Sequence, residues 1–132
     1  MSDKITKSEE EWKKVLTPER FHILREKGTE RPFSGDHLTS HEQGIYQCAG
    51  CGLDLFSSEE KFESGTGWPS FTAPISEKVV KITEDKGFFT TRNEVICRRC
   101  GGHLGHVFDD GPKPTGLRYC MNSAALQLVE TK

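Results

Sequence analysis

Apolar positions near the start of the chain recur at helical spacing behind a helix-capping signal. Ser8 and Glu11 have the spacing of a capping box, and Trp12, Val15 and Leu16 then fall on one helical face. We therefore predict a short amphipathic helix that packs through this face.

A second short helix is predicted to follow directly. Thr17 can cap it and a proline occupies its first position, while Phe21 and Leu24 supply apolar contacts and Gly28 marks its end. We expect residues 1–30 to form an N-terminal helical arm that packs over one end of the core and carries no chemistry.

The pattern changes after a polar, turn-rich stretch at residues 31–41, which we interpret as a connecting loop. Short segments rich in β-branched and aromatic residues then alternate with Gly, Pro, Asn and Asp. This pattern predicts a mainly β, mostly antiparallel core over residues 42–130, within a single domain spanning residues 1–132. The predicted strands are residues 44–47, 53–56, 79–83, 87–91, 94–96, 106–108 and 117–129, the last with room for a break.

Composition narrows the classes of protein that fit. The chain has 132 residues, of which 33% are hydrophobic and 29% charged, so apolar burial alone is a lean source of stability. A net charge of −2 without a basic block argues against a nucleic-acid partner. No apolar run approaches the roughly 20 residues that span a bilayer, so no membrane partner is expected. The polar N-terminus lacks a secretory signal, and we expect a cytoplasmic protein with reduced cysteines.

Four of the five cysteines form two C-x-x-C pairs, each followed at once by glycine: Cys48 with Cys51, and Cys97 with Cys100. This spacing points both thiolates of a pair at one ion, and four thiolates close a tetrahedral shell with no open position. We therefore predict one structural Zn²⁺ per chain that ties together two hairpins distant in sequence. Bound iron, a thioredoxin-like redox pair and buried thiols without a metal are the alternatives.

Cys120 is the unpaired fifth cysteine. In an extended strand Arg118, Cys120 and Asn122 share one face, and the apolar residues between them share the other. The cation of Arg118 would favour the reactive thiolate. This pattern fits a nucleophile presented to a cleft, and a small buried core thiol is the alternative.

Two further groups are candidates for a site around this cysteine. His103 and His106 directly follow the second cysteine pair, whose metal would fix the backbone that carries them. Histidines without a role are the alternative. Trp68 and Phe71 belong to a glycine-rich loop and could form an apolar wall beside the sulfur, although aromatic residues on loops more often serve packing.

Taken together, four segments of the chain resemble the B-type methionine sulfoxide reductases, the peptide-methionine (R)-S-oxide reductases. The matching segments are residues 46–51, 63–71, 97–108 and 118–123, in that order. The resemblance implies two antiparallel sheets with a zinc site at one side. It also implies reduction of methionine-R-sulfoxide in oxidised proteins.

The resemblance assigns roles to the candidate residues. Cys120 attacks the sulfoxide sulfur and becomes a sulfenic acid, with Arg118 tuning its thiolate. His103 and His106 bind and protonate the sulfoxide oxygen, since imidazoles titrate near neutral pH, and Asn122 adds a polar contact.

The resemblance also implies that Trp68 receives the substrate methyl group, with Phe71 beside it. Many family members carry a recycling cysteine where this chain has Thr66, which cannot form a disulfide. We therefore expect direct reduction of the sulfenic acid by thioredoxin or a small thiol. An aromatic-cage binding module and a zinc-ribbon interaction protein are the competing classes, and the second is disfavoured by the missing basic stripe.

Overall fold

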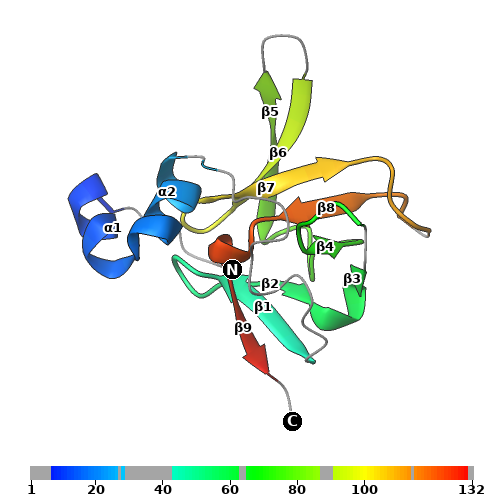
Figure 1. Ribbon diagram of the computed structural model, residues 1–132, viewed down its shortest axis with the longest axis horizontal. Helices are drawn as coiled ribbons and strands as arrows, with labels where there is room; N and C mark the ends of the chain where they lie inside the picture. The colour runs from blue at the N-terminus through cyan, green and yellow to red at the C-terminus, as the bar shows by residue number, and fades with distance from the viewer. Residues whose placement is uncertain are drawn as a thin grey trace.

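The computed structural model describes residues 7–26, 28, 43–62, 65–86, 91–113 and 115–130. Within this part the protein is mainly β, as predicted, with two short helices ahead of the strands (Figure 1). The helices are α1 (Glu9–Val15) and α2 (Pro18–Glu26), and the 3-10 turns are η1 (Ser58–Glu60) and η2 (Ser123–Ala125). The strands are β1 (Gly44–Cys48), β2 (Asp54–Ser57), β3 (Lys61–Phe62), β4 (Ser70–Phe71), β5 (Val80–Lys86), β6 (Thr91–Cys97), β7 (His103–Phe108), β8 (Arg118–Met121) and β9 (Leu126–Glu130).

Helix α1 begins at the predicted capping box. The amide of Glu11 donates to Ser8 Oγ at 3.2 Å, and the amide of Ser8 donates to the Glu11 carboxylate at 3.1 Å. Trp12 and Leu16 are buried, but Val15 is 59% exposed, so the apolar face is narrower than predicted. The helix has only 7 residues and contacts the core through the pair spaced i, i+4, which leaves Val15 outside that stripe.

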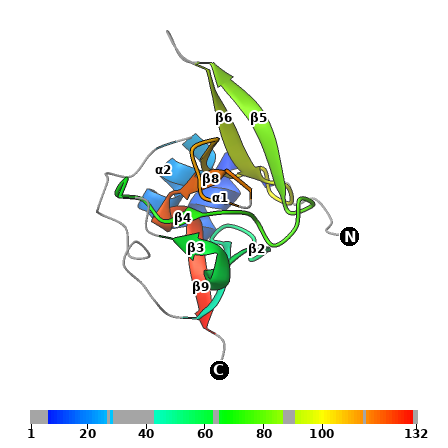
Figure 2. The ribbon, with the colours of Figure 1, turned by 90° about the vertical axis from the view of Figure 1, so that its right-hand side faces the viewer.

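Helix α2 follows the predicted cap and stop signals. The amide of Arg20 donates to Thr17 Oγ1 at 3.2 Å, and the amide of Gly28 donates to the carbonyl of His22 at 2.9 Å. The helix contacts β7 and η2, and neither described helix is long and apolar enough to cross a membrane. The two helices lie side by side beyond the start of β7 (Figure 1), and they stand behind β4 and β8 in the turned view (Figure 2).

The strands form two antiparallel sheets, as expected. One has the order β2-β1-β9 and the other the order β3-β4-β8-β7-β6-β5. The segment predicted as a strand at residues 117–129 is broken by η2, so that β8 joins the larger sheet and β9 the smaller one. One continuous stretch of chain therefore links the two sheets next to Cys120.

The remaining strand predictions differ in extent. Strands β5, β6 and β7 are longer than predicted, and the two-residue strands β3 and β4 were not predicted, since two residues carry no periodicity. Most of the strand predicted at residues 87–91 and the loop at residues 31–41 lie outside the described residues.

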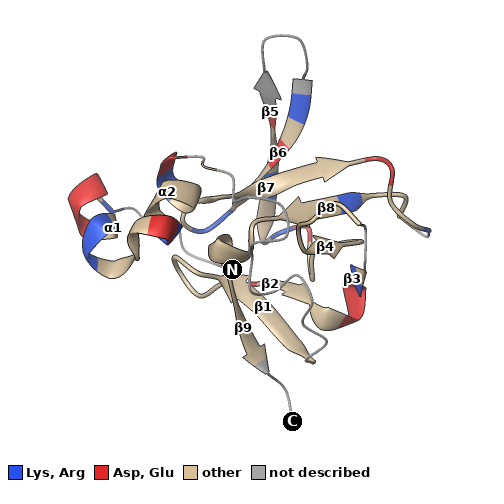
Figure 3. Cartoon of the chain, viewed as in Figure 1, with Lys and Arg blue, Asp and Glu red and all other residues tan. Residues whose placement is uncertain are grey.

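Aromatic rings fill the space between the sheets. Phe56 on β2 stacks on Phe71 of β4 with ring centroids 4.6 Å apart, and Tyr46 on β1 meets Phe71 edge-on at 5.2 Å. Tyr119 on β8 also contacts Phe56. Charged residues of both signs lie on the helical arm, while β1 and β4, one strand of each sheet, carry none (Figure 3). This core holds the back of β8 and leaves its other face for a site.

Candidate active site

The two cysteine pairs meet, although they come from different sheets. One pair lies at the β1–β2 turn and the other at the β6–β7 turn. The four Sγ atoms of Cys48, Cys51, Cys97 and Cys100 all lie within 4.8 Å of one another. Four thiolates at these distances would repel one another, and a cation between them would remove that repulsion. The cluster can therefore hold a metal ion.

The two turns that carry these cysteines have the same backbone pattern. Gly52 and Gly101 adopt positive φ values of 78° and 75°, which favour glycine. The amide of each donates back over a 2.8 Å hydrogen bond, to the carbonyl of Cys48 and of Cys97 respectively. The glycine after each pair is therefore part of the turn that aims the sulfurs.

The helical arm covers this cysteine cluster. Arg25 on α2 donates from Nη1 to the carbonyl of Cys100 at 2.8 Å, and its guanidinium lies 4.7 Å from the centre of the Trp12 ring. The Leu24 side chain lies so close to Gly102 that a Cβ there would be 3.0 Å from it. The arm therefore supports the cysteine-bearing turns directly.

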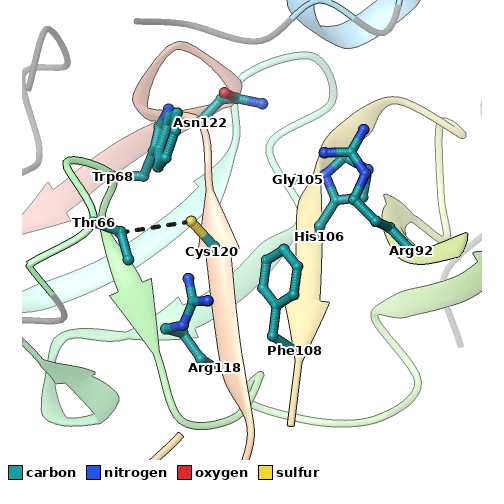
Figure 4. Close-up of a pocket in the computed structure, with 9 residues that line it drawn as sticks. All are labelled: Thr66, Trp68, Arg92, Gly105, His106, Phe108, Arg118, Cys120 and Asn122. Atoms are coloured by element: carbon teal, nitrogen blue, oxygen red, sulfur yellow. Dashed lines mark hydrogen bonds between the residues drawn. The ribbon is translucent and has the colours of Figure 1, made fainter. Parts of the chain in front are cut away.

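Cys120 lies in a pocket on the face of β8 that points away from the aromatic core. Arg118, Cys120 and Asn122 line this pocket together, while Tyr119 and Met121 between them are buried on the other side. The pocket, which we call the Cys120 pocket, measures about 200 Å³. Its lining residues are Thr66, Trp68, Arg92, Gly105, His106, Phe108, Arg118, Cys120 and Asn122 (Figure 4).

The glycine-rich loop forms one wall of the pocket. It is fastened to β8 by the amide of Met121, which donates to the carbonyl of Pro69 at 3.0 Å, and it turns through Gly67 at a φ of 93°. Trp68 and Thr66 on this loop stand beside Cys120 (Figure 4). Thr66 Oγ1 lies 3.9 Å from Cys120 Sγ.

Opposing influences set the acidity of the Cys120 thiol. Burial raises its pKa above the ordinary value, whereas hydrogen bonds from Thr66 and the positive charge of Arg118 act in the opposite direction. Arg118 is itself held by Asp110, through contacts of 2.8 Å from Nε and 3.1 Å from Nη2 to the two carboxylate oxygens. The net effect is a pKa above the ordinary thiol value, which favours the protonated thiol.

The structure places the two candidate histidines at different depths. His106 lies opposite Cys120 in the β7–β8 register and lines the pocket. His103 is buried behind it and is not among the pocket-lining residues, and the two ring centroids are 5.3 Å apart. Their rings meet because Leu104 is an extra residue in the β6–β7 ladder, which shifts His103 onto the same side as His106.

Phe71 is not placed at the pocket with Trp68. It is fully buried in the aromatic core between the sheets. Sequence reasoning missed four groups near the site: Glu94, Arg92, Asp110 and Gly105. Each takes its place through strand pairing or a long-range contact, and the sequence pattern alone carried no signal for them.

Comparison with known proteins identifies the family. The SelR domain matches residues 16–130. The peptide methionine sulfoxide reductase MsrB of Methanosarcina mazei is 64% identical over 124 residues, covering 94% of this chain and 89% of the relative. The MsrB of Bradyrhizobium diazoefficiens is 58% identical over 126 residues, covering 96% of this chain and 91% of the relative.

A solved structure shares the fold at low sequence identity. The Mis18 "Yippee-like" domain superposes with a TM-score of 0.54 at 18% identity, over 69% of this chain and 99% of that one. At this identity the likeness concerns the fold alone. The SelR match and the high identities establish that this chain belongs to the family of B-type methionine sulfoxide reductases.

Proposed function

We propose that this chain reduces methionine sulfoxide in oxidised proteins through attack of Cys120 on the sulfoxide sulfur. The reaction class is that of its family, the peptide-methionine (R)-S-oxide reductases. One observation carries the residue assignment: Cys120 lines a pocket that also contains an indole, an imidazole, a guanidinium and a carboxamide. A sulfoxide needs an apolar contact for its methyl group and hydrogen-bond donors for its oxygen, and this pocket offers both kinds of group.

The proposed roles follow from these positions. Trp68 stands beside Cys120 and offers its aromatic face to the methyl group on the substrate sulfur (Figure 4). His106 lies opposite Cys120 in the β7–β8 pair and binds the sulfoxide oxygen. His103, whose ring lies behind that of His106, helps to protonate this oxygen. Asn122 donates from Nδ2 to the carbonyl of Leu104 at 3.2 Å, which fixes its side chain at the pocket edge.

The proposed chemical step transfers one oxygen atom from the substrate to Cys120 and two electrons from Cys120 to the substrate. The substrate oxygen moves from the methionine sulfur to the sulfur of Cys120, breaking one S–O bond and forming another. The methionine sulfur gains two electrons, the cysteine sulfur loses two, and the proton of the thiol ends on the transferred oxygen. Because Arg118 and Thr66 favour the thiolate, they assist Cys120 when its proton leaves.

An external thiol completes the proposed cycle. The other four described cysteines lie together in the cluster that we propose holds a metal, and as ligands none of them would be available as a recycling thiol for Cys120. We infer that the sulfenic acid is reduced by two electrons from thioredoxin or a small thiol, which releases water and leaves the reductant as a disulfide. Thr66, where many family members carry the recycling cysteine, places its Oγ1 3.9 Å from Cys120 Sγ.

Zinc is the metal that we propose for the cysteine cluster. Two of the sulfur–sulfur distances are 3.7 Å, between Cys48 and Cys100, and 3.5 Å, between Cys51 and Cys97, and all four sulfurs lie within 4.8 Å of one another. A Zn–S bond of about 2.3 Å gives a tetrahedron with edges of about 3.8 Å, so these separations fit. All four ligands would come from the protein, so the ion would stabilise the fold and leave no position for substrate.

A stereospecific assay tests the proposed function. A peptide with methionine sulfoxide, resolved by epimer and supplied with dithiothreitol, should be reduced at the R epimer, and the Cys120→Ser variant should show no turnover. Val15→Ser on the exposed helix face is the matched control and should keep full activity. Turnover by the Cys120→Ser variant would contradict the role of Cys120 as nucleophile, and absence of turnover in the unchanged chain would support a binding module in which the cysteine is incidental.

A further inference from the structure

A buried ion-pairing arrangement lies behind the Cys120 pocket. Glu94 Oε2 accepts a hydrogen bond from His103 Nδ1 at 2.8 Å, and both side chains are only 3% exposed. The other carboxylate oxygen, Oε1, accepts from Thr83 Oγ1 at 3.2 Å. The carboxylate is therefore held from both sides, by β5 and by β7.

Such a carboxylate is costly in a core, so its presence calls for a reason. Burying a charged group without partners is strongly unfavourable, and an apolar side chain in its place is often as stable or more so. Glu94 lies directly opposite His106 in the β6–β7 register and contacts His103. It thus stands beside both histidines of the site without being among the residues that line the Cys120 pocket.

The contact determines which nitrogen of His103 carries a proton. A carboxylate can only accept, so Nδ1 of His103 must donate, and Nε2 is then the nitrogen left for exchange with the site. The ring meets His106 nearly edge-on, with an interplanar angle of 67°. A carboxylate behind a histidine also favours the imidazolium form, which is the form that can donate a proton from either nitrogen.

We propose that Glu94 is a positioning residue for the proton donor of the reductase reaction, which orients His103 and keeps it protonated behind His106. This inference rests on the proposed function. In the step that it serves, a proton passes from the histidine pair to the sulfoxide oxygen while that oxygen moves to the Cys120 sulfur, and the Cys120 proton restores the pair.

The groups around His103 define what a titration would report. Glu94 faces it from β6 and His106 from its own strand, and Thr83 on β5 reaches it through Glu94. Arg25 on α2 lines a second small cavity together with His103 and Glu94, and its charge opposes protonation. Arg25 donates to the Cys100 carbonyl. The charged group that contacts the His103 ring directly is the carboxylate of Glu94.

The substitution Glu94→Gln tests the proposal with little change in shape. The amide oxygen can still accept from His103 and the amide nitrogen can donate to Thr83, but the charge is gone. We expect kcat to fall about 10-fold to 100-fold with KM nearly unchanged, as is typical when a group that orients an active residue is changed. The alkaline limb of the kcat profile should move to lower pH, because the imidazolium then loses its proton more readily. Glu84→Gln, at an exposed position on β5, is the control and should alter neither quantity.

A nuclear magnetic resonance titration of the His103 ring separates this proposal from the proposed function. Its midpoint should lie at lower pH in Glu94→Gln than in the unchanged chain, whether or not the protein turns over sulfoxide. An unchanged midpoint and an unchanged kcat limb would overturn the positioning role, even in an active reductase. If Glu94→Gln does not fold, Thr83→Val removes the hydroxyl that donates to Glu94 Oε1 and leaves more of the carboxylate charge facing His103, so the His103 midpoint should move to higher pH; an unchanged midpoint in this variant would overturn the proposal.

Discussion

Gly105 lies so close to the backbone of Cys120 that no side chain fits between them. A Cβ on Gly105 would be 2.1 Å from the carbonyl oxygen of Cys120 and 2.9 Å from the Cα of Met121. The close approach of β7 to β8 brings His106 and Cys120 to directly opposed positions. The geometry of the Cys120 pocket therefore depends on Gly105, a residue without a side chain.

Gly105→Ala should accordingly impair both stability and activity. Because the contacts are with backbone atoms, the strands must separate, and we expect a loss of about 3 kcal/mol in the free energy of unfolding. Gly50→Ala is the matched control, since its Cβ would make ordinary contacts at 3.5 Å or more and should be tolerated. Urea unfolding and the reductase assay measure both effects, and a Gly105→Ala variant of unchanged stability would contradict the packing argument.

Thr66→Cys should convert the enzyme to one that recycles through an internal disulfide. Thr66 Oγ1 is 3.9 Å from Cys120 Sγ, and the flanking Gly65 and Gly67 have positive φ values that allow the loop to adjust. Closing the gap to an S–S bond of about 2.05 Å then requires a loop movement of roughly 2 Å.

A single turnover without reductant provides the measurement. In the Thr66→Cys variant, Cys120 and the new thiol should both become resistant to alkylation, and mass spectrometry should find a loss of two hydrogens. The unchanged chain and Thr66→Ser should instead show sulfenic acid at Cys120. A disulfide involving Cys120 in the unchanged chain would refute the proposed direct reduction by an external thiol.

The pH dependence of alkylation should report the acidity of Cys120. Burial raises its pKa above the ordinary thiol value, so the rate with iodoacetamide should still be rising at alkaline pH. Arg118 and Thr66 lower that pKa, so Arg118→Met and Thr66→Val should each move the rise to higher pH and slow alkylation several-fold at neutral pH. A rise that moved to lower pH in Arg118→Met would show that the guanidinium does not stabilise the thiolate.

Much of this site could be predicted from the local pattern of the sequence. The capping residues place both helices, and the alternation of side chains along an extended strand places Arg118, Cys120 and Asn122 around one pocket. The spacing of the cysteine pairs likewise predicts a joint cluster, because the two-residue turn and its glycine are local features.

Features that depend on how strands pair were not predictable. The contact between Glu94 and His103 requires the extra residue Leu104 in the ladder, and no periodicity marks such a bulge. Phe71 belongs to the aromatic core and not to the pocket, because β4 places it against Phe56 of the other sheet. A short loop sequence does not reveal which of its aromatic residues turns inward.

Removal of the metal should unfold the core. The cysteine cluster joins the β1–β2 turn of one sheet to the β6–β7 turn of the other, and structural zinc contributes on the order of 10 kcal/mol in small domains. A mercurial reagent should therefore release one zinc ion per chain, with loss of the cooperative thermal transition. A metal-free chain with an unchanged Tm would show that the apolar core alone suffices.

Arg25 should link the stability of the helical arm to retention of the metal. Its guanidinium donates to the Cys100 carbonyl and stacks on Trp12, so Arg25→Ala removes the anchor of the arm at the second cysteine turn. A hydrogen bond from a charged group contributes about 1.5–3 kcal/mol, so we expect a loss of that size in the free energy of unfolding and faster zinc release to a chelator. Lys13→Ala removes an exposed ion pair with Glu9 and a contact of its ammonium with the Phe21 ring, neither of which involves the cysteine turns, so it should leave zinc release unchanged and cost less than about 1 kcal/mol in the free energy of unfolding. Equal zinc release rates in the two variants would mean that the arm covers the cluster without stabilising it.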